Sequence, residues 1–202
     1  MDDEFSERAF PTRAVWSGTN HMEGSAVTPI FTTSTYQLND DRYRDWAEGG
    51  QHSLIYSRWS SVNSEAVASK VASLEGAEDG ETLASGMAAI SSTLLSMLSK
   101  GDHMVTSPDI YGGTYGLLTS DFPRFGIDVT MADIRDPSSF EAAINENTKV
   151  LYVETLTNPV LKVCDLEAMA SIAKKHGLIS VCLLYTSPSP RDRTRSRMPS
   201  SA

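Results

Sequence analysis

The chain has 202 residues, a hydrophobic fraction of 40% and a formal net charge of −9. This size allows one large domain or parts of two, and the apolar content indicates a globular core rather than a disordered chain. The acidic balance argues against a nucleic-acid-binding protein, which would usually carry a basic face. No apolar stretch approaches the roughly 20 residues of a membrane-spanning helix, so we expect neither nucleic acid nor membrane as a partner.

The first 62 residues show little helical periodicity and are rich in Ser, Thr, Gly and aromatic residues. Thr28–Phe31 is the clearest candidate for extended structure. A segment this long and irregular is unusual inside one compact domain. We therefore interpret residues 1–62 as an N-terminal arm that packs on another subunit. Large aromatic residues argue against a merely disordered terminus; they are Trp16, Tyr36, Tyr43, Trp46, Tyr56 and Trp59.

A partial α/β domain is predicted for residues 63–181, beginning with two helices. The first helix is expected at Ser64–Glu75, stopped by Gly76. Its inward face would carry Val67, Val71 and Leu74. A short strand at Glu81–Ala84 would follow, and Ser85 would then cap a helix that runs to Lys100. The inward residues of this second helix would be Met87, Ile90, Leu94 and Met97.

The rest of this domain alternates between strands and helices. In chain order we expect a strand at His103–Thr106, a helix at Tyr115–Phe122, a strand at Ile127–Met131, a helix at Pro137–Asn145, a strand at Lys149–Glu154, a helix at Leu166–His176 and a strand from Leu178 to Val181. The inward residues of the last helix would be Leu166, Met169, Ala170 and Ala173. Such alternation predicts an α/β fold with a mainly parallel sheet and helices on both faces.

The composition changes abruptly at residues 182–202, which hold four arginines against one aspartate. Nothing in this tail can bury a core. We interpret it as non-native sequence, such as translated adapter or an out-of-frame product, or else as a disordered tail. A natural basic tail and a phosphorylatable Ser-Pro/Arg segment are the alternatives.

Cysteine use and the N-terminus indicate where the protein resides. Two cysteines, Cys164 and Cys182, are too few for a disulfide framework and favour a reducing compartment. Met1–Glu4 is acidic and has no apolar run, so it does not resemble a signal peptide. Cys164 is expected to be a small buried residue. The four histidines are scattered without ligand spacing, so no metal site is predicted. We expect a cytoplasmic protein.

Three short motifs fall where an α/β fold binds ligands. Ser85-Gly86-Met87 opens a helix, whose free amides and dipole favour an anion such as phosphate. Tyr111-Gly112-Gly113 follows a strand and so lies on a loop at the end of the sheet. Asn158-Pro159 follows the strand that ends at Glu154, because proline cannot continue the ladder. Taken singly, each motif is more often a helix cap, a packed loop tyrosine or a turn.

In this order and spacing, and together with Tyr56-Ser57-Arg58, the motifs resemble the pyridoxal-phosphate (PLP) enzymes of cysteine and methionine metabolism. This family includes cystathionine lyases and synthases and methionine lyases. The resemblance runs from about residue 10 to residue 181. It implies the large domain of the aspartate-aminotransferase-like fold, known as fold type I, in truncated form. One departure is Ser61-Val62-Asn63-Ser64, where the family has Asn-Pro.

The resemblance assigns roles to individual residues. The backbone of Ser85, Gly86 and Met87 would bind the PLP phosphate. Tyr111 would stack on the PLP ring and assist proton transfer as the catalytic residue. Asn158 would bind the phenolic oxygen of PLP, and Glu154 resembles a family glutamate near the site, although a strand-end charge is nearly as good an interpretation. Tyr56 and Arg58 would reach across a subunit interface to the neighbour's phosphate.

The implied activity is that of a carbon–sulfur lyase or transsulfuration enzyme acting on cystathionine or a related sulfur amino acid, in a homotetramer of two tight dimers. Elimination or replacement, and β or γ chemistry, stay open, although Gly113 favours the cystathionine enzymes over the methionine lyases. The absence of Gly-x-Gly-x-x-Gly argues against a nucleotide-binding Rossmann domain.

Four residues that the resemblance requires are missing from residues 1–202: an aspartate, the Schiff-base lysine, a phosphate-binding Ser or Thr beside it and a carboxylate-binding arginine. The aspartate that would pair with the ring nitrogen should fall at position 183, which is Leu183. None of the lysines matches the position of the Schiff-base lysine. We therefore expect the chain as written to be inactive. The alternative is a non-catalytic partner subunit that lends Tyr56 and Arg58 to a full-length homologue.

Overall fold

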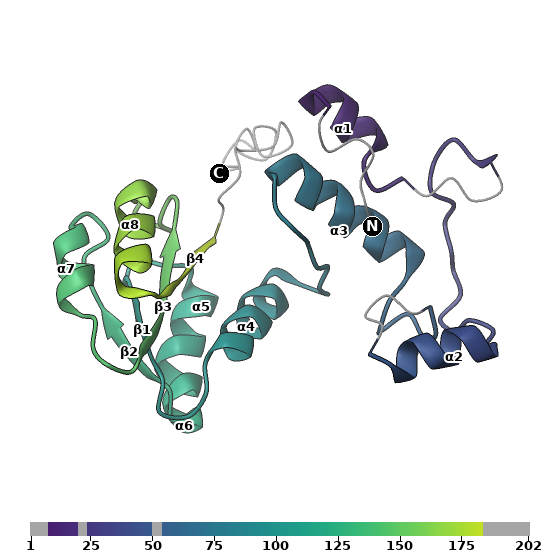
Figure 1. The fold of residues 1–202 in the computed structure, drawn as a ribbon. Coiled ribbons are helices and arrows are strands. Elements are labelled where there is room, and N and C mark those ends of the chain that lie inside the picture. Colours follow the sequence, from purple (N-terminus) through teal and green to yellow (C-terminus); the bar gives the residue numbers. More distant parts are fainter. Residues whose placement is uncertain (1–7, 20–23, 50–53, 184–202) are drawn as a thin grey trace, which may run out of the picture. The chain divides into compact units, whose positions relative to one another are not determined.

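The computed structural model describes residues 8–19, 24–49 and 54–183, which form two units with a boundary between Ala84 and Ser85 (Figure 1). The expectations for Met1–Glu4 and for the tail from residue 184 onward lie outside the described residues. None of the helices in the described ranges combines the length and hydrophobicity needed to cross a bilayer.

The first unit contains three helices, α1 (Phe10–Trp16), α2 (Asp40–Ala47) and α3 (Val62–Glu75). The α3 helix begins earlier than predicted, because Ser61 is its N-cap and accepts a hydrogen bond from the Ser64 amide at 3.2 Å. It ends, as predicted, at Gly76 in the left-handed conformation.

Helix α1 lies against α3, and Gly18 permits the close approach. The φ of Gly18 is +67°, and a Cβ there would lie 2.5 Å from the Ala66 carbonyl oxygen. Three polar contacts join α1 and its C-cap to α3, and in one of them the Arg13 guanidinium donates to the Ser73 carbonyl. Ser17 Oγ lies 2.9 Å from Ser73 Oγ, and Lys70 Nζ donates to the Val15 carbonyl at 3.0 Å.

The predicted inward face of α3 is wrong. Val67 and Val71 are 55% and 52% exposed, whereas Ala68 and Ala72 are buried. The reason is that the chain after α3 folds back along the alanine side. A Cβ on Gly80 would lie 2.8 Å from the Ala68 carbonyl oxygen, so only small residues allow this contact.

The segment Glu81–Ala84 forms no strand in this structure, contrary to the prediction. A strand needs a neighbour to complete its hydrogen-bond ladder. The β ladders of the described residues begin only at His103. Thr28–Phe31 is also outside any strand. Its backbone is held by Asn63, whose side chain accepts from the Phe31 amide and donates to the Pro29 carbonyl, both at 2.8 Å.

The second unit is built on a four-stranded parallel sheet with the order β2-β1-β3-β4. Its strands are β1 (His103–Thr106), β2 (Asp128–Met131), β3 (Thr148–Glu154) and β4 (Ile179–Leu183). Its helices are α4 (Gly86–Met97), α5 (Gly112–Gly116), α6 (Phe122–Phe125), α7 (Pro137–Ala142) and α8 (Leu166–His176). A single π turn at Leu117–Asp121 joins α5 to α6, so the helix predicted at Tyr115–Phe122 is part of a longer helical path.

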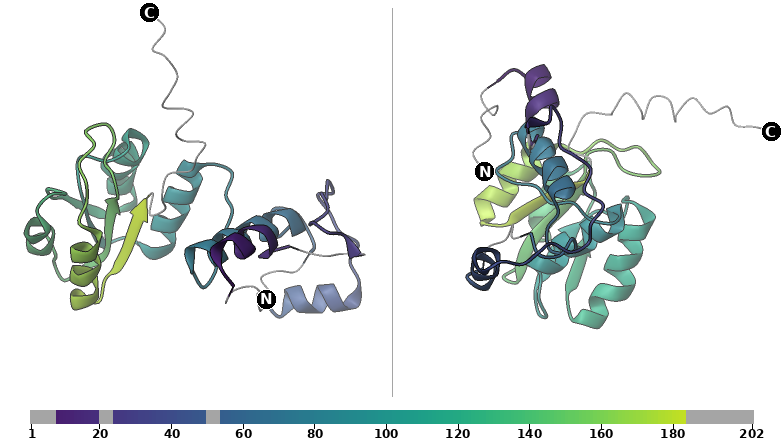
Figure 2. Two further views of the ribbon diagram at one scale, coloured as in Figure 1. Left: turned by 90° about the horizontal axis from the view of Figure 1, so that it is seen from above. Right: turned by 90° about the vertical axis from the view of Figure 1, so that its right-hand side faces the viewer.

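Helices cover both faces of this sheet, which confirms the predicted fold class (Figures 1 and 2). Successive residues of β3 point to opposite faces. Val150 and Tyr152 pack in a core with α4, the π turn and α6, whereas Leu151 and Val153 pack in a second core with α7 and α8. The burial of nearly all of β3 is the mark of a central parallel strand.

The predicted inward faces of the sheet-covering helices are mostly confirmed. Ile90 and Leu94 of α4 are buried, as are Met169 and Ala173 of α8. Ala170 is exposed, contrary to the prediction, and Ile172 takes its place in the core. The buried residues of α8 therefore follow the three- and four-residue spacing of one helical stripe, from which Ala170 is displaced.

Candidate active site

The carboxyl ends of β1 and β3 form a switch point in the topology of the second unit. These two strands are neighbours, but the chain leaves β1 toward β2 and leaves β3 toward β4, in opposite directions. The loops after the two strands, residues 107–111 and 155–165, therefore diverge at this edge. In open α/β sheets such a point is where ligands bind.

The N-terminus of α4 presents an anion-binding backbone. Ser85 is the N-cap in extended conformation, and its Oγ accepts a hydrogen bond from the Ala88 amide at 3.1 Å. The amides of Gly86 and Met87 lie at the first two helical positions, which have no partner within the helix. Around the Cβ position of Gly86 there is no heavy atom within 4 Å. The first turn of α4 therefore offers open space and positive dipole to an anion.

Tyr111 lies beside the start of α4. A Cβ on Gly113 would lie 2.6 Å from Tyr111 Cε1 and 2.9 Å from Met87 Sδ. The Tyr111 ring therefore folds back over Gly113, and both are next to Met87. At 43% exposure, the ring still presents a free face to a planar ligand. The structure thus brings two of the predicted motifs together.

Glu154, at the end of β3, holds the backbone of Tyr111. Its side chain is 1% exposed, and Oε1 accepts a hydrogen bond from the Tyr111 amide at 3.0 Å. The Tyr152 hydroxyl lies 3.5 Å from the same oxygen. Burial raises the pKa of Glu154, and the hydrogen bond from the Tyr111 amide opposes that shift. This anchoring contact was not part of the sequence prediction.

Asn158 lies on an exposed loop just beyond β3, at the carboxyl edge where it was predicted. Thr157, which is fully buried, shapes this loop. Thr157 Oγ1 accepts from the Lys162 amide at 2.8 Å, and its carbonyl accepts from the Leu161 amide at 3.0 Å. The Asn158–Pro159 peptide bond is cis.

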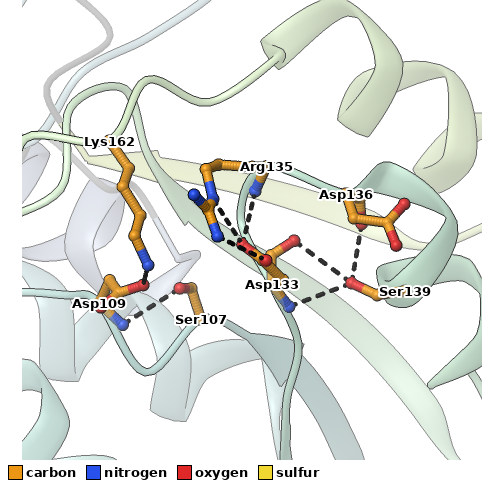
Figure 3. A network of polar contacts seen from close by, with 7 residues as sticks. All are labelled: Ser107, Asp109, Asp133, Arg135, Asp136, Ser139 and Lys162. Carbon is orange, nitrogen blue, oxygen red and sulfur yellow. Dashed lines mark hydrogen bonds and ion pairs between the residues drawn. The ribbon is translucent and has the colours of Figure 1, made fainter.

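Sequence reasoning missed an ion pair that joins the two loops at this edge. Lys162, on the loop after β3, pairs with Asp109, on the loop after β1 (Figure 3). No local pattern could predict this pair, because the two residues are 53 positions apart in the sequence.

Tyr56 and Arg58 belong to the first unit, whereas the other predicted site residues belong to the second. The Arg58 guanidinium carbon is 4.9 Å from the centroid of the Tyr56 ring, a cation–π arrangement. A backbone bridge between Thr35 and Tyr56 holds the segment, together with a hydrogen bond from the Tyr36 amide to the Ile55 carbonyl at 3.0 Å. Arg58 is exposed, so its guanidinium remains accessible to an anion.

Leu183 occupies the position where the resemblance requires an acid. It pairs with Glu154 across β3 and β4, and its carbonyl accepts from the Thr155 amide at 3.2 Å. Its side chain packs against the core on the α4 side. An apolar side chain therefore stands at the carboxyl edge next to Glu154.

Comparisons with known proteins place the chain among enzymes of one family. Residues 11–191 match the family model described as Cys/Met metabolism PLP-dependent enzyme. The L-methionine gamma-lyase of Porphyromonas gingivalis is 36% identical over 191 residues, which is 93% of this chain and 48% of that protein. The cystathionine gamma-lyase of Bacillus subtilis is 40% identical over 159 residues, which is 78% of this chain and 40% of that protein. The chain thus spans less than half the length of these relatives.

Solved structures give the same result. A Campylobacter jejuni protein that carries N'-pyridoxyl-lysine-5'-monophosphate matches 86% of this chain and 43% of its own, with a TM-score of 0.80 and 35% identity. The cystathionine gamma-lyase of Lactobacillus plantarum, complexed with L-serine, matches 86% of this chain and 44% of its own, with a TM-score of 0.76 and 36% identity.

The described residues fit PLP at two of its parts. The open first turn of α4 suits the phosphate, and the exposed face of Tyr111 suits the ring. The position beside Glu154 does not supply a charge for the ring nitrogen, because Leu183 is apolar.

Proposed function

Because this chain belongs to the Cys/Met metabolism PLP-dependent enzyme family, we propose that it is part of a carbon–sulfur lyase or transsulfuration enzyme acting on cystathionine or a related sulfur amino acid. The observation that supports this most is the meeting of the α4 N-terminus, Tyr111 and Glu154 at the switch point of the sheet. When bound, PLP supplies an electron sink for charge that develops on the amino acid.

The residues of the chain divide the work of holding the cofactor. The amides of Gly86 and Met87 bind the phosphate through the open first turn of α4. Tyr111 covers one face of the ring and, through its hydroxyl, moves a proton near the leaving group. Glu154 keeps Tyr111 in place through its backbone amide, at 3.0 Å. Asn158 binds the phenolic oxygen.

Tyr56 and Arg58 bind the PLP phosphate of a neighbouring subunit. The whole assembly is a dimer of dimers, and it resides in the cytoplasm. The support is the exposure of Arg58 and its stacking on Tyr56, which pre-orients the guanidinium fork for a phosphate. The proposal of a reducing compartment is supported by the low number of cysteines, Cys164 and Cys182, neither of which is in a disulfide.

A polypeptide of residues 1–202 is proposed to be inactive alone, because no lysine in it matches the cofactor-anchoring position and Leu183 replaces the acid. Purified polypeptide supplied with PLP and cystathionine should form no keto acid. Measurable elimination would overturn this part of the proposal. In the alternative, the chain is a non-catalytic partner, and it should then co-purify with an intact homologue when the two are expressed together.

A negative charge introduced at the first turn of α4 tests the cofactor site itself. Gly86→Asp adds a carboxylate to the first turn of α4, where the dipole tolerates it and the space is open. We expect the folded variant to lose PLP binding. Bound PLP is measured by its visible absorbance in the protein fraction after gel filtration. Gly86→Asn is the matched neutral control. Equal uptake by Gly86→Asp and Gly86→Asn would contradict the site.

A further inference from the structure

Internal hydrogen bonds hold the shape of the loop after β3, but they do not connect it to the loop after β1. A bridge between Leu156 and Val163 closes its base, and the Thr157 amide donates to the Lys162 carbonyl at 3.0 Å. These contacts fix the shape of the loop. They do not determine where Asn158, at its tip, lies with respect to the loop after β1.

The loop after β1 is anchored at both of its ends. Ser107 is fully buried and its Oγ accepts from the Asp109 amide at 3.1 Å. Two residues after Asp109, the Tyr111 amide is held by Glu154. Asp109 therefore stands between two fixed points, and its carboxylate is a rigid place for another loop to attach.

Lys162 makes that attachment (Figure 3). The side chains of Lys162 and Asp109 are only 27% and 22% exposed, so solvent screens their interaction less than that of a surface pair. The nearby cation Arg135 behaves differently. Its guanidinium bonds with Asp133, two residues away in its own loop, at 3.2 and 3.3 Å.

We propose that Lys162 and Asp109 are positioning residues, whose ion pair fixes the loop that carries Asn158 to the loop that carries Tyr111. The inference rests on the proposed function, in which Asn158 and Tyr111 contact one cofactor. Lys162 thereby acts through Asn158 and Tyr111 rather than on substrate.

The test compares two lysine variants with a matched arginine variant in the whole 202-residue chain. Lys162→Met removes the bridging charge and keeps most of the stem, and Lys162→Arg keeps a cation within reach of Asp109. Arg135→Met removes a nearby charge whose side-chain hydrogen bonds go to Asp133 rather than to the bridge. Amide hydrogen exchange is measured for residues 107–113 and 155–163, and circular dichroism of added PLP is measured in the visible range.

We expect Lys162→Met to raise exchange in both segments by about fivefold, as for loss of a strong ion pair in a locally opening loop. The same variant should weaken the PLP dichroism. Lys162→Arg should restore both signals, and Arg135→Met should change neither. Asp109→Asn should reproduce the effect of Lys162→Met, so the test does not depend on one variant folding.

The outcomes separate this inference from the proposed function. If the unmodified chain gives no PLP dichroism, the proposed function fails. The exchange data still show whether the ion pair holds the two loops together. If Lys162→Met leaves exchange at residues 107–113 unchanged, or if Lys162→Arg raises it equally, the positioning role is overturned.

Discussion

The two units of the chain use their hydrophobic residues in different ways. The second unit buries its large side chains in two cores, one on each face of a parallel sheet. The first unit leaves Trp16, Tyr43, Trp46 and Trp59 exposed and buries mainly small residues of α3. This difference indicates that the second unit has cores of its own, whereas the first exposes aromatic side chains; the packing of residues 1–62 on another subunit stays a prediction.

The largest expected effect is a matched pair of leucine truncations. Leu94 of α4 is fully buried, so Leu94→Ala should lower the free energy of unfolding by about 2–5 kcal/mol. Leu38 of the first unit is exposed, and Leu38→Ala should cost less than about 0.5 kcal/mol. Urea denaturation at low protein concentration measures both. Equal losses would show that the first unit has a core of its own and would break the comparison.

A smaller effect is expected at adjacent glycines of the site. Gly113→Ala places a Cβ 2.6 Å from the Tyr111 ring and 2.9 Å from Met87 Sδ, which should cost about 1–3 kcal/mol through displaced side chains. Gly112→Ala meets no atom within 4 Å and is the control. Thermal unfolding should separate the two variants, and the Tyr111 amide resonance of ¹⁵N-labelled chain should shift more in Gly113→Ala than in Gly112→Ala. A stability loss in Gly112→Ala as large as that in Gly113→Ala would argue against the Tyr111 contact.

The smallest effect concerns pH and the middle of the sheet. His103 is buried between Thr148 Oγ1 and Thr130 Oγ1, each 2.8 Å from a ring nitrogen. Burial lowers the pKa of His103 below its usual 6.5, and the neighbouring Asp128 carboxylate partly opposes this. The unfolded chain therefore binds the proton first, so stability is full above pH 6.5 and is lost as pH falls through the lowered pKa.

In His103→Gln, the dependence of the unfolding free energy on pH just below 6.5 should be shallower than in the unmodified chain. Denaturation midpoints measured in steps of pH provide the readout. If the two slopes coincide, burial of a neutral His103 does not contribute, and the sheet is less closed around this residue than the structure shows.

Much of the second unit could be predicted because its signals are local. Ser85 marks the start of α4 through capping chemistry, and the apolar run of β3 marks a central strand. In the first unit, Gly76 marks the end of α3 in the same way. The failures are tertiary. Val67 and Val71 looked inward by spacing, but the neighbour of α3 required the small face at Ala68 and Ala72. Glu81–Ala84 has strand-like residues but no partner strand among the described residues.

The candidate site was predictable where a motif carries its own geometry. The anion-binding N-terminus of α4 was predictable from its helix cap, and the place of Tyr111 from the end of a strand. The structure brings the two together at Gly113. The supporting contacts could not be predicted. The hydrogen bond from Tyr111 to Glu154 and the ion pair from Lys162 to Asp109 span 43 and 53 residues, and they depend on strand order.

The central claim is that the second unit holds PLP at the start of α4 beneath Tyr111. The most direct test is a titration of ¹⁵N-labelled chain with PLP, followed by amide resonances. The account predicts saturable shifts at Gly86, Met87 and Tyr111. Excess inorganic phosphate, which occupies the first turn of α4 in place of PLP, should reverse the shift at Tyr111. Shifts that do not saturate, or that saturate only outside residues 85–87 and 111–113, would contradict it.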